Sequence, residues 1–451
     1  MFIKTIKSDD LAHLSYLLVS GSQAAVIDPR RDCSLYATEA AAAGARITHI
    51  FETHRHEDFL SGAAALSDMT GADVYHGENA DGEVEYAQTV KEGDSFKLGH
   101  LKIKVIATPG HTKDSVCYAL YDTEFGEDAV GVFTGDTLFI GDVGRTDFYP
   151  DQKAEMAGQL FDSLQKLKAL GDQVIIYPAH GAGSVCGDAM ADREFSTLGY
   201  ERFNNPGMKL TDRDEFIDKK TSESHPMPPY FNLMERLNLS GASPMPAVQV
   251  PPALDLAVFK AKQKQARVID VRGVADFIGA HVPGSLALPA DMVAAYAGWL
   301  LEPDTELLLV AKDADQAQLA NTSLLRTGFE GVVGFLSPAI TGWAHAAEPF
   351  THVHAIEAKE VERRLSTNDN WQLLDVRSEK EFSSGHIDGA KSIFLGDLPE
   401  QLDQLDRQQA HTVLCESGAR ATIGASILLA AGFKHVDVFL GAMGAWRNHQ
   451  S

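Results

Sequence analysis

Histidines and aspartates of the kind that bind metal ions stand at the ends of successive apolar runs in the first half of this chain. The runs read ITHIFETH, KIKVIATPGH, VGVFTGDTL and QVIIYPAH. The metal-type residues are His54, His56, Asp58, His111, Asp136 and His180. Active sites of layered α/β folds collect at strand ends, where loops carry the chemistry on a rigid scaffold. We therefore predict a layered α/β domain that holds a metal ion.

Size and charge limit what the whole chain can be. At 451 residues it is long enough for roughly two to four domains. The formal net charge of −24 argues against nucleic acid or an anionic membrane as a partner, because an acidic surface repels both. Its four cysteines are too scattered for a disulfide framework, and the start is broken by Asp9, Asp10 and His13, unlike a signal peptide or a membrane span. We expect a cytoplasmic protein.

The second half contains an internal repeat that follows a Pro-rich stretch, SGASPMPAVQVPPA. The segment VIDVRGVADFIGAHVPG aligns with LLDVRSEKEFSSGHIDG at an offset of 105 residues. The matched pairs are Asp270 and Asp375, His281 and His386, and Gly284 and Gly389. An offset held over many positions predicts two copies of one small α/β domain with a parallel sheet. The expected organisation is residues 1–240, a linker at 241–253, a first copy at 254–349 and a second copy at 350–451.

The first-half motifs resemble a known family. THRHED, TPGHT, FTGDTL and YPAHG follow the metallo-β-lactamase superfamily in order and spacing over about the first 235 residues. FIGDVGRTDF and the LSG after the metal loop resemble the persulfide dioxygenases, the ethylmalonic encephalopathy protein group, rather than glyoxalase II. The resemblance implies a four-layer αββα sandwich with one Fe(II) per chain, bound by two histidines and one carboxylate. Carried over position by position, the ligands are His56, His111 and Asp136, and the groups beside them or facing the substrate are His54, Asp58 and His180.

Phe59 suggests why one metal ion is enough. Hydrolases with such a loop usually have a third His after the acid, which helps to hold a second metal ion, and a bridged pair of metals generates hydroxide for hydrolysis. Here that position is Phe59. A single metal bound on one face by two His and a carboxylate leaves open positions for substrate and O₂, as in non-haem Fe(II) oxygenases. The alternative is that Phe59 is only a packing change in a one-metal zinc hydrolase.

Arg145 is the candidate for substrate binding. In the family the matching Arg lies beside the pocket of the thiol carrier, where a guanidinium can pair with a carboxylate of glutathione. The alternative is an ordinary ion pair with Asp142 or Asp147. After His180 the chain reads GAGSVCG where better-known relatives carry a Tyr, so the carrier is glutathione or another thiol. Cys186 in this stretch is either a sulfur relay or a small buried residue.

The second copy contains a candidate sulfur-transfer loop, in HTVLCESGARATIGASILLAAGF. A strand ends at Cys415, a loop closes at Arg420, and a helix follows; the loop residues between them are Glu416, Ser417, Gly418 and Ala419. This pattern resembles the active loop of rhodaneses. Backbone N–H groups and the positive end of the helix would stabilise the thiolate and its persulfide. The alternative is a buried structural Cys.

The first copy lacks this nucleophile. Its equivalent strand, ELLLVAKDADQAQLA, has Ala311 where the Cys would stand, followed by Lys312. We therefore expect an inactive rhodanese-like domain that serves as a spacer or an interface.

The whole chain resembles the fused persulfide dioxygenase–sulfurtransferases of bacterial sulfide detoxification. The resemblance implies that the iron domain oxidises a thiol persulfide with O₂ to sulfite, and that Cys415 passes sulfane sulfur to sulfite to give thiosulfate. We expect a homo-oligomer. Two alternatives are a zinc thioesterase of the glyoxalase II type and a non-catalytic sulfur carrier or sensor.

Overall fold

The computed structural model describes the chain except residues 79–81, 185–186, 188, 247–248, 368–369 and 451. The described chain divides into two compact units. Unit 1 comprises residues 1–245 with 326–328, and unit 2 comprises 246–325 with 329–451. The Pro-rich stretch therefore contains the point where the chain passes from one unit to the other.

Unit 1 contains two six-stranded sheets. The first has the order β1-β2-β3-β4-β5-β6, with bounds Phe2–Ser8, His13–Ser20, Gln23–Ile27, Arg46–Phe51, Asp73–Gly77 and Gln88–Val90. The second has the order β12-β11-β10-β9-β8-β7. From β7 to β12 the bounds are Ser95–Leu98, Leu101–Ala107, Val116–Asp122, Ala129–Gly135, Ile175–Pro178 and Ser196–Thr197.

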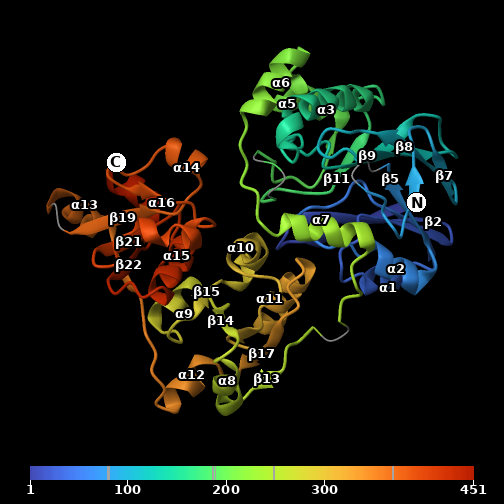
Figure 1. The fold of residues 1–451 in the computed structure, drawn as a ribbon. Helices are drawn as coiled ribbons and strands as arrows, with labels where there is room; N and C mark the ends of the chain where they lie inside the picture. Colours follow the sequence, from blue (N-terminus) through green and yellow to red (C-terminus); the bar gives the residue numbers. More distant parts are fainter. Residues whose placement is uncertain (79–81, 185–186, 188, 247–248, 368–369, 451) are drawn as a thin grey trace. The chain divides into compact units, whose positions relative to one another are not determined.

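The two sheets pack face to face, and helices cover their outer faces (Figure 1). Aromatic residues such as Phe51, Tyr118 and Phe133 fill the space between the sheets. Helices α1 (Ser34–Ala42) and α2 (Ala63–Thr70) bury Tyr36 and Leu66 against the first sheet. Helix α3 (Lys153–Lys168) covers the second sheet. The predicted four-layer αββα sandwich is confirmed.

The remaining helices of unit 1 follow in order along the chain. Their bounds are η1 Pro150–Gln152, α4 Leu198–Asn204, α5 Pro206–Lys209, α6 Arg213–Ser222 and α7 Phe231–Ser240. Helix α6 contributes Phe216 to the core beneath α3, where its ring packs edge-on against Phe161.

Unit 2 contains two five-stranded sheets with the same strand order. The sheet of the first copy is ordered β13-β17-β16-β14-β15, and that of the second copy is β18-β22-β21-β19-β20. From β13 to β17 the bounds are Ala253–Leu254, Arg267–Asp270, Leu286–Ala287, Leu307–Val310 and Val332–Leu336. From β18 to β22 they are His354–Ile356, Trp371–Asp375, Lys391–Ser392, Ala410–Leu414 and Val436–Phe439. All paired strands run parallel, as predicted.

Helices flank both sheets of unit 2. In the first copy they are α8 Leu256–Lys262, α9 Val274–Gly279, η2 Ala290–Met292, α10 Val293–Leu300, α11 Ala314–Arg326 and α12 Ala339–His345. In the second copy they are α13 Ala358–Thr367, α14 Glu379–Ser383, η3 Leu398–Glu400, η4 Leu402–Gln404, α15 Ala419–Ala430 and α16 Ala442–Gln450. Within the described ranges, no helix combines the length and the apolar character that crossing a bilayer requires.

The same buried ion pair braces both copies. Arg272 donates to Asp270 at 2.8 and 2.5 Å, and Arg377 donates to Asp375 at 3.0 and 2.7 Å. Each Arg also donates to a backbone carbonyl of the turn that follows, at 2.7 and 2.8 Å. Asp375 and Arg377 therefore brace the second copy in the same way as Asp270 and Arg272 brace the first.

Candidate metal centre and sulfur-transfer loop

Three buried side chains converge at the edge of the unit 1 sandwich. They are His54, which follows β4, His111, which follows β8, and Asp136, which follows β10. Each offers one possible ligand atom, and these atoms lie within 4.8 Å of one another. The Nε2 atoms of His54 and His111 lie 3.8 and 3.4 Å from Oδ2 of Asp136. Strand ends thus bring together residues that are far apart in the sequence.

The Nε2 atoms of His54 and His111 are available for a metal ion. Thr53 donates its hydroxyl to Asp28, so its oxygen accepts the Nδ1–H of His54 at 2.9 Å. The Nδ1–H of His111 is donated to the backbone carbonyl of Arg145 at 3.0 Å. Each Nε2 therefore presents a lone pair, and neither has a hydrogen-bond partner in the part of the chain that the structure describes. Such outer hydrogen bonds fix the tautomer and ring orientation of metal-binding histidines.

The charge states of these three groups also suit a metal ion. Burial lowers the pKa of His54 well below its ordinary value and also lowers the pKa of His111, so both rings are neutral. Burial acts to raise the pKa of Asp136, but His180 and the other histidines hold it well below its usual range. Two neutral imidazoles and one carboxylate form the deprotonated donor set that a divalent metal ion needs.

His56, predicted as a ligand, lies outside this group of converging side chains, whereas His54 belongs to it. The Nε2 of His56 is 3.3 Å from Oδ1 of Asp28, and its ring packs 4.4 Å from that of Phe59. Burial acts to lower the pKa of His56, but Asp28 raises it above its ordinary value. The sequence did not reveal this because the two histidines are one residue apart, and only the position of Asp28 distinguishes them.

His180, predicted as a group beside the metal ligands, lies between the carboxylates of Asp58 and Asp136. Its Nδ1 is 2.8 Å from Oδ1 of Asp136, and its Nε2 is 3.0 Å from Oδ2 of Asp58. Burial acts to lower the pKa of His180, but the two aspartates raise it well above its ordinary value. His180 therefore orients Asp136 and offsets part of its charge, and Asp58 holds His180 from the other side.

Phe59 packs against histidines that lie outside the triad. Its side chain is fully buried, and its ring lies 4.1 Å from that of His13 and 4.4 Å from that of His56. His13 was not predicted as a site residue, because one His in an apolar strand usually belongs to the core. Both of its ring nitrogens lack a partner among the described residues, and burial lowers its pKa well below the ordinary value.

The guanidinium of Arg145 forms hydrogen bonds to other residues of this chain, which argues against its predicted role in substrate binding. Its side chain is fully buried and donates to Asp147 at 2.6 and 3.1 Å and to the carbonyls of Pro226 and His225. Its guanidinium lies 4.8 Å from the centre of the Phe148 ring. This is the ion-pair alternative, with Asp147 as the partner. Cys186, the candidate relay, lies outside the described residues.

In unit 2 the candidate sulfur-transfer loop surrounds a buried thiol. Cys415 follows β21, and the backbone N–H of Gly418 donates to its Sγ at 3.1 Å. Gly418 has a φ of 109°, and helix α15 begins directly after it. The positive end of α15 therefore lies next to the sulfur. Arg420 forms a two-pronged pair with Glu381, at 2.7 and 2.6 Å.

In the equivalent loop of the first copy, side chains of the loop accept hydrogen bonds from its backbone N–H groups. Ala311 is buried at the end of β16. The Oε1 of Gln316 accepts the backbone N–H of Lys312 at 2.9 Å, and Oδ1 of Asp313 accepts the backbone N–H of Gln316 at 2.8 Å. These N–H groups are thus already bonded, and the position of a nucleophile is filled by a methyl group.

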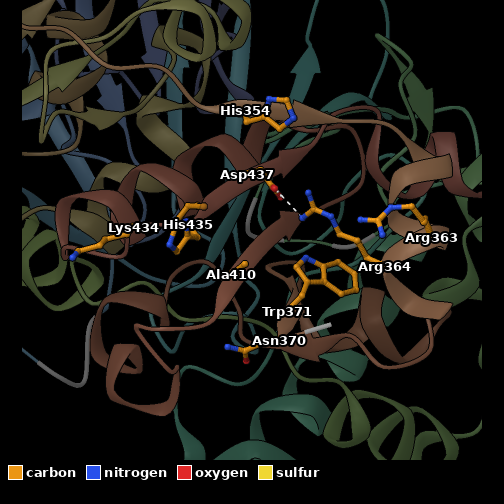
Figure 2. A pocket seen from close by; sticks show the side chains of 10 residues that line it. His354, Arg363, Arg364, Asn370, Trp371, Ala410, Lys434, His435 and Asp437 are labelled. Carbon is orange, nitrogen blue, oxygen red and sulfur yellow. Dashed lines mark hydrogen bonds and ion pairs between the residues drawn. The ribbon is translucent and has the colours of Figure 1, made fainter. Parts of the chain in front are cut away.

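A separate cavity lies at the amino ends of the strands in the second copy, whereas Cys415 lies at their carboxyl ends. Its volume is about 470 Å³, and residues at the amino ends of the strands line it (Figure 2). Figure 2 shows Arg364 directed at Asp437, with Nη1 2.9 Å from the carboxylate, and Trp371 beneath it. Because Cys415 follows the carboxyl end of β21, this cavity does not belong to the sulfur-transfer loop.

Comparison with known families agrees with this architecture. A model of the metallo-beta-lactamase superfamily matches residues 8–180, and a model of the rhodanese-like domain matches residues 255–346 and 357–449. A structure titled metallo-beta-lactamase from Staphylococcus aureus subsp. aureus COL is 30% identical, with a TM-score of 0.68. The match covers 74% of this chain and 98% of the Staphylococcus chain. The chain belongs to the metallo-β-lactamase superfamily and carries two rhodanese-like domains.

Curated relatives match the first unit. A hydroxyacylglutathione hydrolase of Rhizobium etli is 33% identical over 175 residues, which are 39% of this chain and 63% of the relative. That of Rhizobium johnstonii is 30% identical over 246 residues, which are 48% of this chain and 91% of the relative. The chain spans less than two thirds of the length of the first of these. A structure titled ETHE1 from Myxococcus xanthus is 29% identical, covers 54% of this chain and all of its own, and has a TM-score of 0.47.

Proposed function

We propose that unit 1 is a non-haem Fe(II) persulfide dioxygenase and that the second copy in unit 2 is a sulfurtransferase. The observation that carries the first part is the triad of His54, His111 and Asp136. The buried ring of Phe59, at the position where related hydrolases have a His, packs against the neighbouring His56. Two neutral nitrogens and one carboxylate on a single face match the donor set of non-haem Fe(II) oxygenases. One ferrous ion per chain would supply redox chemistry with O₂ and positions for the substrate sulfur.

The overall reaction at this site balances with one O₂ and one water. A persulfide R–S–SH gives R–SH, sulfite and two protons, so the terminal sulfur loses four electrons and O₂ gains them. The chain's own part is to hold the site and limit access. Asp136 is oriented by His180, the histidine tautomers are fixed by Thr53 and the carbonyl of Arg145, and Phe59 keeps one wall apolar.

The proposed sulfur transfer uses Cys415. Its thiolate attacks the terminal sulfur of a second persulfide, the S–S bond breaks, and the carrier leaves as R–SH. Sulfite then attacks the sulfur held on Cys415, the thiolate of Cys415 leaves, and thiosulfate forms. The N–H of Gly418 at 3.1 Å and the start of α15 stabilise the thiolate in both steps. The carrier is glutathione or another small thiol, and we also propose a homo-oligomer.

A second candidate is a zinc thioesterase, favoured by the hydroxyacylglutathione hydrolases among the relatives. Metal analysis combined with oxygen uptake separates the two. The dioxygenase requires about one iron per chain and persulfide-dependent O₂ consumption. Zinc in the native protein, with turnover of S-acyl glutathione in the absence of O₂, would refute the dioxygenase and support the thioesterase.

A further inference from the structure

One buried side chain of helix α7 holds the backbone of the metal loop. Asn238 is 2% exposed, and its side-chain amide makes three hydrogen bonds within residues 56–61. Its Nδ2 donates to the carbonyls of His56 and Phe59 at 2.8 and 2.9 Å. Its Oδ1 accepts the backbone N–H of Ser61 at 3.0 Å. Because the amide donates on one side and accepts on the other, this pattern fixes its orientation and closes the loop between His56 and Ser61.

Tyr230, at the start of the same helix, makes a fourth bond to this loop. Its side chain is buried, and its hydroxyl donates to the backbone carbonyl of Asp58 at 2.8 Å. Asp58 lies in the sequence between the two carbonyls that Asn238 holds. Side chains of α7 and its N-cap therefore hold the backbone at Asp58 and on both sides of it.

Asn238 is held in turn by a small buried network. The hydroxyl of Tyr86 lies 3.0 Å from the backbone carbonyl of Asn238 and 2.9 Å from Oε2 of Glu52. The other oxygen of Glu52 accepts the hydroxyl of Ser61, whose backbone N–H is bonded to Asn238. Asn238, Ser61, Glu52 and Tyr86 thus form a closed ring of hydrogen bonds. Buried polar networks with every member bonded make a structure rigid and specific.

Asp58 connects this loop to the metal triad. Its Oδ2 is 3.0 Å from Nε2 of His180, and Nδ1 of His180 is 2.8 Å from Oδ1 of Asp136. A shift of the backbone at Asp58 would therefore move His180 and, through it, the carboxylate of Asp136. The contacts run without a break from α7 to one of the three candidate ligands.

We propose that Asn238, with Tyr230 beside it, is a positioning residue of the metal centre: it fixes the loop at Asp58, and Asp58 fixes Asp136 through His180. This assigns a role in metal binding to helix α7, which contributes no member of the triad. The inference rests on the metal site of the proposed function and not on the reaction there. Its tests therefore use Co(II) as a probe and need no turnover.

The first test is titration of the metal-free whole chain with Co(II), whose visible absorption reports the geometry of its ligands. Asn238→Leu keeps a similar volume but removes all three bonds to the loop, so we expect it to lower the Co(II) affinity about tenfold or more and to change the absorption spectrum. Tyr230→Phe removes one bond and should lower the affinity about threefold, which keeps the test decisive if Asn238→Leu folds poorly. Ser20→Ala is the matched control. It removes a buried hydrogen bond to the N–H of His100, at the end of β2 away from His13, and should change neither readout.

The second test asks whether the effect passes through His180. In a His180→Ala background, Tyr230→Phe should change the Co(II) affinity less than about twofold, because the connection to Asp136 is already broken. Equal effects of Tyr230→Phe in both backgrounds would overturn the positioning role. Lower stability of Asn238→Leu in urea, with the Co(II) affinity and spectrum of both variants unchanged, would also overturn it, because the residue would then be structural only.

The same titration separates this inference from the proposed function. If the unaltered protein binds no Co(II), the metal site and the positioning role are both refuted. If it binds Co(II) with the expected effects of the variants but its native metal is zinc and it hydrolyses thioesters, the dioxygenase is refuted and the positioning role of Asn238 stands.

Discussion

His180 donates its Nδ1–H to the carboxylate of Asp136, with Nδ1 2.8 Å from Oδ1 and 3.0 Å from Oδ2. The Oδ2 atom also lies 3.4 Å from Nε2 of His111 and 3.8 Å from Nε2 of His54. The hydrogen bond from His180 therefore holds the carboxylate in place beside the two histidines. Supporting hydrogen bonds of this kind are typical of metal sites.

The first prediction concerns this support. His180→Ala should lower the metal affinity about 10- to 100-fold without abolishing binding, because Asp136 keeps its place but loses its orientation. Metal titration followed by elemental analysis measures the change. His100→Ala, at an exposed His of unit 1, is the matched control. Complete loss of metal from His180→Ala would show that His180 is itself a ligand.

The second prediction separates the two histidines of the metal loop. His54→Ala should abolish metal binding, because it removes one of three converging donors. His56→Gln should retain most of the metal, since His56 is bonded to Asp28 and lies outside the triad. Iron content per chain, measured on both variants, decides between them. The reverse result would restore His56 as the ligand.

The third prediction concerns Phe59. Phe59→His should still bind one metal ion per chain and should gain no efficient thioester hydrolysis, because one added imidazole does not rebuild a second metal site next to His13 and His56. Phe59→Ala should destabilise unit 1 by about 3–5 kcal/mol, as expected for a fully buried ring. Two metal ions in the unaltered protein would contradict the argument built on this residue.

The fourth prediction tests the role of Arg145. Arg145→Met should destabilise the protein by about 3 kcal/mol, because it leaves Asp147 with one fewer partner in a nearly buried place. KM for the persulfide should change little. Arg145 and His225 hold the pKa of Asp147 below its ordinary value against the effect of burial. The carboxylate therefore contributes stability at neutral pH that is lost as the pH falls below about 4.

The measurement is urea unfolding of the unaltered protein and of Asp147→Asn at pH 7 and at lower pH. The difference between the two should shrink as the pH falls, because protonation of Asp147 makes the unaltered protein resemble the variant. A large rise in KM for Arg145→Met with unchanged stability would instead support the substrate-binding role.

Strand-end motifs were enough to predict a layered α/β domain, and the internal repeat predicted the two parallel-sheet copies. The αββα sandwich was predicted from the family resemblance. Apolar runs specify buried strands, and each run ended where a loop residue of the site begins, as at His111 and Asp136. The sequence alone could not distinguish His54 from His56, because the difference depends on Asp28, which directly follows another strand, β3.

The last prediction concerns the product that leaves the enzyme. Cys415→Ser keeps the volume of the side chain, but a hydroxyl cannot hold a sulfane sulfur. Cys415 belongs to unit 2 and the metal triad to unit 1, so O₂ uptake should be nearly unchanged. The product should switch from thiosulfate to sulfite.

A backbone variant should have the same effect on the product without removing the sulfur atom. Gly418 has a φ of 109°, and a Cβ added there would lie 3.2 Å from Leu440 Cδ1, so Gly418→Ala should displace the N–H that faces the thiol. Gly279→Ala, at an open position in the inactive copy, is the control. Chromatography of trapped sulfur anions measures the products. Undiminished thiosulfate from Cys415→Ser would mean that this thiol is not in the pathway, whatever Gly418→Ala shows.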